Sequence, residues 1–105
     1  MIMNQNFERR HSPNRRKTRV PALVIVEGAT VEASILDVSF RGLRLDLMLP
    51  LAPGTPILIH VLGHELPAIV HWSRDNEVGA HLLERLERDL LVEIESAEDD
   101  LAAFR

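Results

Sequence analysis

The most specific chemistry in this sequence lies in two short polar segments. One is Arg15-Arg16-Lys17-Thr18-Arg19, and the other is Asp37-Val38-Ser39-Phe40-Arg41-Gly42. An arginine side chain presents a planar fork of donors that matches two phosphate oxygens, or O6 and N7 of guanine, at once. A carboxylate such as Asp37 only accepts hydrogen bonds, so it suits the paired N1–H and N2–H donors on another edge of guanine. Together the two segments predict a site for a small phosphorylated ligand.

Each segment also has an ordinary structural interpretation. Arginine runs are frequent in solvated basic tails. An Asp-x-Ser-x-x-Gly stretch can simply form a turn, in which Asp37 accepts hydrogen bonds from nearby amides and Gly42 takes a positive φ. Their occurrence together, in this order and beside predicted strands, makes the ligand-binding interpretation more specific than either segment alone.

The elements that must position these segments are predicted to be β-strands. Apolar and polar residues alternate from Leu43 to Leu49, a period of two that is typical of a strand with one face in the core. Turn signals stand at Glu27-Gly28 and Gly63-His64, and the three prolines of residues 50–56 mark a connection. These patterns indicate an antiparallel barrel or sandwich. Its six predicted strands span residues 20–26, 30–38, 43–49, 57–62, 66–72 and 78–82.

The end of the chain follows a different period. Its apolar residues are spaced three or four apart, which draws one stripe along a helix predicted over residues 84–104. The members of this stripe are Leu83, Leu86, Leu90, Ile94, Ala97, Leu101 and Phe104. Such a helix either covers an open side of the sheet or offers a surface to a second copy or another protein.

Length and composition limit the possible classes of protein. With 105 residues, 46% of them hydrophobic, the chain suits one globular domain, and the lack of cysteine excludes disulfides and thiolate metal sites. No stretch approaches the roughly 18 apolar residues of a membrane span, and no apolar run at the start resembles a secretory signal. We therefore expect a cytoplasmic protein with a flexible arm at residues 1–14 and one domain at residues 15–105.

The net charge of −4 conceals an asymmetry between the two parts of the chain. Residues 1–20 hold six basic residues and one acidic residue, whereas residues 21–105 hold six basic and fifteen acidic ones. A basic arm on an acidic body does not suit a nucleic-acid polymer, whose binding proteins usually have a broader basic surface. It can hold a compact anion locally. We expect a monomer or a weak homodimer.

The two polar segments resemble the signature of the PilZ domain family. That signature is an Arg-Arg-x-x-Arg segment leading into a six-stranded β-barrel, followed one hairpin later by Asp/Asn-x-Ser-x-x-Gly. Val70-His71-Trp72 followed by Val78-Gly79 is similar to the last hairpin of the family, so the resemblance covers about residues 8–105. It implies a mainly β fold, a six-stranded antiparallel barrel with a C-terminal helix. It also implies binding of the bacterial second messenger cyclic di-GMP.

The resemblance further implies a set of ligand-binding residues, which are Arg15, Arg16, Arg19, Asp37, Ser39, Gly42 and Trp72. The outer two arginines would grip phosphate and guanine with Arg16 assisting, while Asp37 and Ser39 would read a guanine edge. Gly42 would shape the turn and permit close approach of the backbone. Trp72 would stack on a base, although a ring half-buried at a strand end is an equally good interpretation of the same residue.

The expected function is therefore capture of cyclic di-GMP, with the signal relayed to an unidentified partner protein because the chain has no output domain. The alternative is a protein-interaction module of the PilZ type that works without nucleotide. Five histidines invite a metal site, but a predicted turn separates His60 from His64, so we expect no metal and no cofactor besides the ligand. No nucleophile elbow or P-loop is present, and we expect no enzymatic activity.

Overall fold

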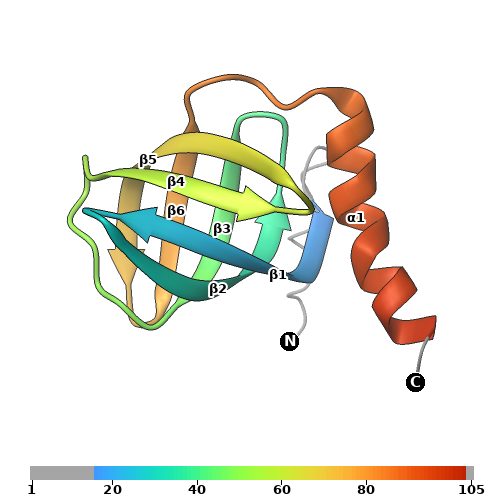
Figure 1. Cartoon of the computed structure of the whole chain (residues 1–105), viewed down its shortest axis with the longest axis horizontal. Coiled ribbons are helices and arrows are strands. Elements are labelled where there is room, and N and C mark those ends of the chain that lie inside the picture. The colour runs from blue at the N-terminus through green and yellow to red at the C-terminus, as the bar shows by residue number, and fades with distance from the viewer. Residues whose placement is uncertain (1–15, 104–105) are drawn as a thin grey trace, which may run out of the picture.

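Six antiparallel strands close into a barrel, and one helix follows them (Figure 1). The computed structural model describes the backbone of residues 16–103 and the side chains of residues 19–97. Around the barrel the strands run in the order β1-β2-β3-β6-β5-β4. The elements are β1 Arg16–Val26, β2 Ala29–Val38, β3 Gly42–Leu47, β4 Pro56–Val61, β5 His64–Arg74, β6 Glu77–Leu82 and α1 Arg88–Ala103. The predicted barrel with a C-terminal helix is confirmed, whereas the flexible arm predicted for residues 1–14 lies outside the described residues.

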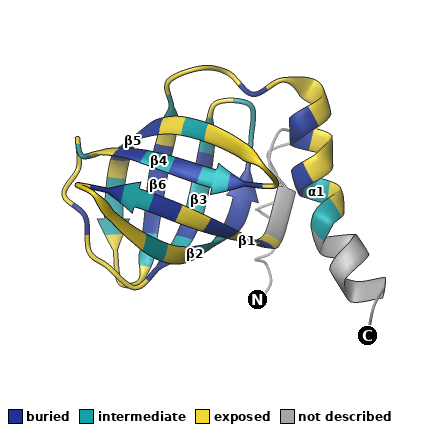
Figure 2. Ribbon diagram, in the orientation of Figure 1, coloured by how far each residue is buried: buried dark blue, intermediate teal, exposed yellow. Residues whose placement is uncertain are grey.

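The inner faces of the strands fill the barrel with apolar side chains. In β3 the buried Leu43, Leu45 and Leu47 alternate with the partly exposed Arg44 and Asp46. Figure 2 shows buried and more exposed positions following one another along the strands. Because successive side chains of a strand point to opposite faces, the same alternation that builds the core carries the polar residues to the outer surface.

Strand β3 ends two residues earlier than the leucine alternation predicts. The chain bends after Leu47, so Leu49 lies outside the strand and is exposed. Leu51 is buried in its place and packs into the core. The leucine alternation therefore continues to Leu49, two residues beyond the end of strand β3.

Two hairpins are closed by turns in which both residues have positive φ. The values are 51° and 82° for Glu27 and Gly28, and 50° and 81° for Leu62 and Gly63. This is the geometry of type I′ turns, whose twist matches that of the flanking strands. The second turn lies one residue earlier than the predicted Gly63-His64 pair, because His64 already pairs with Val61 at the start of β5.

Helix α1 begins at Arg88, four residues later than predicted. The Leu83 amide donates to the Pro67 carbonyl at 3.0 Å, and the Leu86 amide donates to the Phe40 carbonyl at 2.7 Å. These bonds attach the connection to the barrel, and the helix follows with a bond of 3.0 Å from the Leu91 amide to the Glu87 carbonyl. Leu83, predicted as the first residue of the apolar stripe, is 62% exposed.

The helix covers one end of the barrel and packs beside β1 (Figures 1 and 2). The predicted stripe is confirmed from Leu86 to Ala97, and the side chains of Leu101 and Phe104 lie outside the described residues. The residues of this stretch that pack into the core are Leu86, Leu90, Leu91, Ile94 and Ala97. In the part of the chain that the structure describes, no helix is long and apolar enough to cross a membrane.

Candidate ligand-binding site

The pairing of β1 with β2 brings the two polar segments together. Arg16 is opposite Val38, and Lys17 is opposite Asp37. Strand β1 thus starts at Arg16 rather than at Val20, which corrects the predicted boundary. A strand pairs through backbone groups, so a run of charged residues can extend it without the apolar alternation that sequence reasoning looks for.

The arginine segment is described only in part. Arg15 and the side chain of Arg16 lie outside the described residues. The Arg19 side chain forms an ion pair with Asp46 of β3, with 3.4 Å between Nη1 and Oδ2, and is 59% exposed. A register shift between Lys17 and Val20 interrupts the pairing where Arg19 stands. Exposed ion pairs of this kind contribute about 0–1 kcal/mol, so Arg19 can change partner at small cost.

Ser39 and Gly42 form the narrow turn between β2 and β3. The Ser39 amide donates to the Gly42 carbonyl at 2.9 Å, and the Ser39 hydroxyl lies 3.2 Å from both the amide and the carbonyl of Gly42. The hydroxyl therefore holds the turn in this structure. Its predicted contact with a guanine edge would require some of these bonds to be exchanged.

The backbone conformation of Gly42 differs from the one that the turn interpretation predicted. Gly42 is absent from the described glycines with positive φ, which are Gly28, Gly54 and Gly63, so the expected left-handed turn residue is wrong. The backbone of Gly42 lies close to β6, because a Cβ atom at Gly42 would lie 3.1 Å from the carbonyl oxygen of Ala80, and its predicted role in ligand binding stays a prediction. A larger residue would press β3 away from β6.

Asp37 is a buried carboxylate held by an arginine that the sequence analysis did not single out. Only 7% of Asp37 is exposed, and its Oδ2 accepts a hydrogen bond from Arg44 Nε at 2.7 Å. Arg44 Nη1 donates to Glu77 Oε1, also at 2.7 Å. Although burial lowers the pKa of Arg44, hydrogen bonds to Glu77 and Asp37 raise it overall. The signal that could have found Arg44 is the register, since Asp37 and Arg44 are directly opposite on β2 and β3.

Trp72 lies across the neighbouring strand. A Cβ atom added at Gly79 of β6 would fall 2.2 Å from Trp72 Nε1, so the indole occupies the space that any other side chain would need. The pairing of β5 with β6 has a register shift between Val70 and Trp72, after which Trp72 stands opposite Gly79. The Arg74 guanidinium carbon stands 5.3 Å from the ring centroid, within range of a cation–π contact. The indole is partly exposed, so both interpretations of Trp72 remain compatible with its position.

A hollow of about 240 Å³, which we call the turn hollow, brings Ser39, Gly42 and Trp72 together. Its other lining residues are Arg41, Leu43, Arg44, His71, Gly79, Ala80 and His81. The imidazoles of His71 and His81 are stacked, with 4.2 Å between their centroids. Guanidinium donors and an aromatic surface thus face one space. Asp37 does not line this hollow, but it is hydrogen-bonded to Arg44, which does. Arg19 does not line the hollow either and is paired with Asp46.

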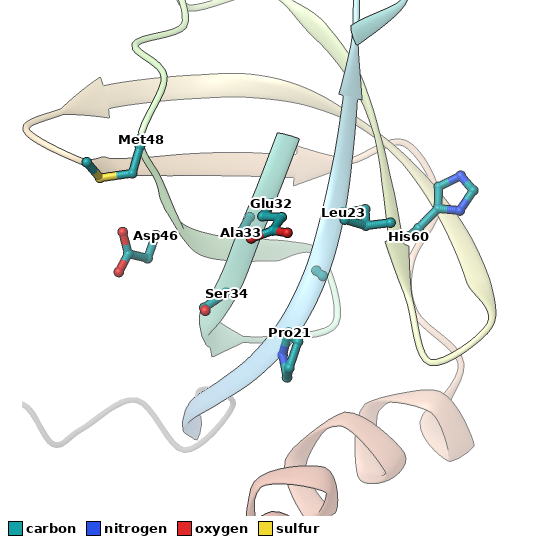
Figure 3. A pocket seen from close by; sticks show the side chains of 9 residues that line it. Pro21, Leu23, Glu32, Ala33, Ser34, Asp46, Met48 and His60 are labelled. Atoms are coloured by element: carbon teal, nitrogen blue, oxygen red, sulfur yellow. The ribbon is translucent and has the colours of Figure 1, made fainter. Parts of the chain in front are cut away.

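A second hollow, the sheet hollow, has a volume of about 630 Å³ and a different chemistry. It is lined by Pro21, Ala22, Leu23, Glu32, Ala33, Ser34, Asp46, Met48 and His60 (Figure 3). None of the predicted site residues is among them. Met48 is 76% exposed, and the charged members, Glu32 and Asp46, are acidic. This surface does not suit a phosphorylated ligand.

Comparison with known proteins agrees with the architecture. The sequence matches the PilZ domain family over residues 6–97. Among solved structures, the fold is similar to the crystal structure of the PilZ domain of CeSA from a cellulose-synthesizing bacterium, with a TM-score of 0.58 and 19% sequence identity. That alignment covers 84% of this chain and 97% of the other, and at this identity the likeness concerns the fold alone. No match is found among curated proteins.

Proposed function

This chain belongs to the PilZ domain family, and we propose that it binds cyclic di-GMP beside the β2–β3 turn and relays the signal to a partner protein. PilZ domains are generally cyclic di-GMP-binding and signalling modules rather than enzymes. The proposal assigns phosphate and guanine contacts to Arg15, Arg16 and Arg19, and a guanine edge to Asp37 and Ser39. Gly42 would let the ligand and β6 approach the turn closely. Such a function belongs in the bacterial cytoplasm.

The observation that carries the proposal is the β1–β2 register. Lys17 stands opposite Asp37, so the two polar segments are neighbours although these two residues are twenty positions apart in the sequence. Cyclic di-GMP carries two phosphates and two guanines. Arginine donors suit its phosphates, and a carboxylate suits the N1–H and N2–H donors of guanine.

Trp72 adds an aromatic surface to the same region. It lines the turn hollow together with Ser39 and Gly42, and its indole is partly exposed. Base–aromatic stacking contributes about 1–3 kcal/mol for each base, so one guanine stacked on this ring would add substantially to affinity. Release of Arg19 from Asp46 costs less than a charge-assisted hydrogen bond to phosphate, about 1.5–3 kcal/mol, would supply.

Calorimetric titration with cyclic di-GMP tests the proposal. Arg15→Ala, Arg19→Ala and Asp37→Ala should each weaken binding by about tenfold or more, since each removes at least one charge-assisted hydrogen bond. Arg88→Ala, at the exposed start of α1, is the matched control and should bind like the unchanged protein. Cyclic GMP should bind poorly. Unchanged affinity in all three site variants would contradict the assignment of these residues.

The sheet hollow favours a second candidate function, a protein-interaction module that needs no nucleotide. Leu23 and Met48 expose apolar surface there beside acidic side chains. A partner that binds this face would bind equally well with and without cyclic di-GMP. Its binding would be reduced by Met48→Glu and unaffected by Asp37→Ala, because Asp37 does not line the sheet hollow, whereas a ligand-dependent partner would respond to Asp37→Ala.

A further inference from the structure

We infer that Arg44 is a positioning residue for Asp37 and thereby sets the preference of the site for guanine. This inference rests on the proposed binding of cyclic di-GMP. It concerns a residue outside both polar segments, and it assigns Arg44 a role in selectivity that acts through the carboxylate.

The first step is that Arg44 holds the orientation of Asp37. The two residues face each other across β2 and β3, and the Nε–Oδ2 distance is 2.7 Å. The Asp37 side chain is 10% exposed, so water would compensate only in part for loss of the bond from Arg44. A register shift between Ile35 and Asp37 brings the carboxylate into line with Arg44.

The second step is that Glu77 holds Arg44 from the opposite side. Glu77 belongs to β6 and accepts from Nη1 at 2.7 Å, so one guanidinium spans three adjacent strands, β2, β3 and β6. A guanidinium is planar, and the directions of its donors are fixed relative to one another. Anchoring Nη1 therefore also sets the direction in which Nε points. A lysine, with a single ammonium group, could not form both hydrogen bonds in this fixed geometry.

The third step connects orientation with selectivity. Guanine offers N1–H and the 2-amino group side by side, and a carboxylate can accept from both only when its oxygens face that edge. A carboxylate oxygen can accept two hydrogen bonds, so Oδ2 can keep the bond from Arg44 while it accepts from guanine. If Asp37 turns away, it meets one donor at most. Hypoxanthine, which keeps N1–H but lacks the 2-amino group, would then be bound nearly as well as guanine.

The test compares cyclic di-GMP with cyclic di-IMP by calorimetric titration. The unchanged protein should prefer cyclic di-GMP. Arg44→Gln should weaken cyclic di-GMP binding by about tenfold and cyclic di-IMP binding much less, so the ratio of the two affinities should fall. Arg44→Lys should behave like Arg44→Gln, and Arg88→Gln on α1 should leave both affinities unchanged. General destabilisation would weaken both ligands alike, so an unchanged ratio would overturn the inference.

A double-mutant cycle separates action through Asp37 from direct contact with the ligand. In an Asp37→Asn background, Arg44→Gln should change the affinity for cyclic di-GMP less than twofold. A further tenfold loss in that background would mean that Arg44 binds the ligand by itself, which would contradict a positioning role. Thermal unfolding of every variant reports whether the barrel is intact.

Glu77→Gln provides a variant that keeps both Arg44 and Asp37, should Arg44→Gln fail to fold. It should lower the guanine preference in the same direction by a smaller factor, and an unchanged preference would count against the inference. If the unchanged protein does not bind cyclic di-GMP, the proposed function and this inference both fail. If it binds and neither variant alters the ratio, only the role of Arg44 is wrong.

Discussion

At the scale of single residues, the contact between Trp72 and Gly79 shows how one missing side chain determines the position of another. The indole lies where a Cβ atom of residue 79 would stand, at 2.2 Å from Nε1. Gly79 is buried in β6, so neither strand can move aside without disturbing the barrel. The Trp72 indole can therefore line the turn hollow only because residue 79 is a glycine.

Replacement of Gly79 by alanine should expel the indole from this position. Trp72 is the single tryptophan of the chain, so its fluorescence emission should shift to longer wavelength as the ring becomes solvated. Overpacking should also lower the free energy of unfolding by about 1–3 kcal/mol, measured by chemical denaturation. In a Trp72→Val background the same alanine should cost little. A similar cost in both backgrounds would show that the indole is not the obstacle.

At the scale of elements, the type I′ turns set the hairpins, and each begins with a non-glycine residue in the left-handed conformation. Leu62 has a φ of 50° and is 40% exposed, so it takes a backbone conformation that suits asparagine or glycine and gains little from packing. Glu27 takes the same conformation in the β1–β2 turn. The β4–β5 hairpin therefore forms despite its first turn residue.

Leu62→Asn should stabilise the domain, because asparagine tolerates the left-handed conformation and favours this turn. We expect a gain of about 1 kcal/mol in the free energy of unfolding, and a midpoint of thermal unfolding raised by about 4–8 °C. Gly63→Ala, which forces a Cβ into a φ of 81°, should lower the midpoint. A decrease with Leu62→Asn would mean that the leucine makes packing contacts that outweigh its backbone cost.

At the scale of the whole molecule, the β2–β3 turn is tied to the segment that leads into α1. The Leu82 amide donates to the Arg41 carbonyl at 2.9 Å, and the Leu86 amide donates to the Phe40 carbonyl at 2.7 Å. Arg85 also stands over the Phe40 ring, with its Cζ 4.1 Å from the centroid. A ligand held at the turn would therefore contact residues that are hydrogen-bonded to the segment leading into the helix.

Cyclic di-GMP should slow hydrogen exchange at the amides of Leu82 and Leu86. Their acceptors are turn carbonyls, and a ligand that orders the turn should make local opening rarer, by about tenfold at saturation. The amide of Leu58 serves as the internal control, because β4 pairs with β1 and β5 and not with the strands that flank the turn. Equal protection in the free and bound protein, measured by NMR exchange, would show that the turn and the helix connection are not coupled.

Prediction from the sequence succeeded where a repeating pattern is sufficient and failed at the ends of elements. Apolar runs, alternation and turn signals together identified all six strands, and the spacing of three and four identified the helix. The boundaries at Arg16, Leu47 and Arg88 were missed because each depends on a backbone partner from a distant part of the chain. Side-chain periodicity carries no information about such partners.

For the candidate site, the sequence alone determined which residue types are present and that two polar segments flank the first hairpin. Only the tertiary structure decided that Lys17 stands opposite Asp37, that Arg44 holds the Asp37 carboxylate, and that Trp72 lies on Gly79. The physical reason is that each of these contacts depends on strand register. Register is set by packing around the entire barrel, and a shift of one residue would turn every one of these side chains to the other face.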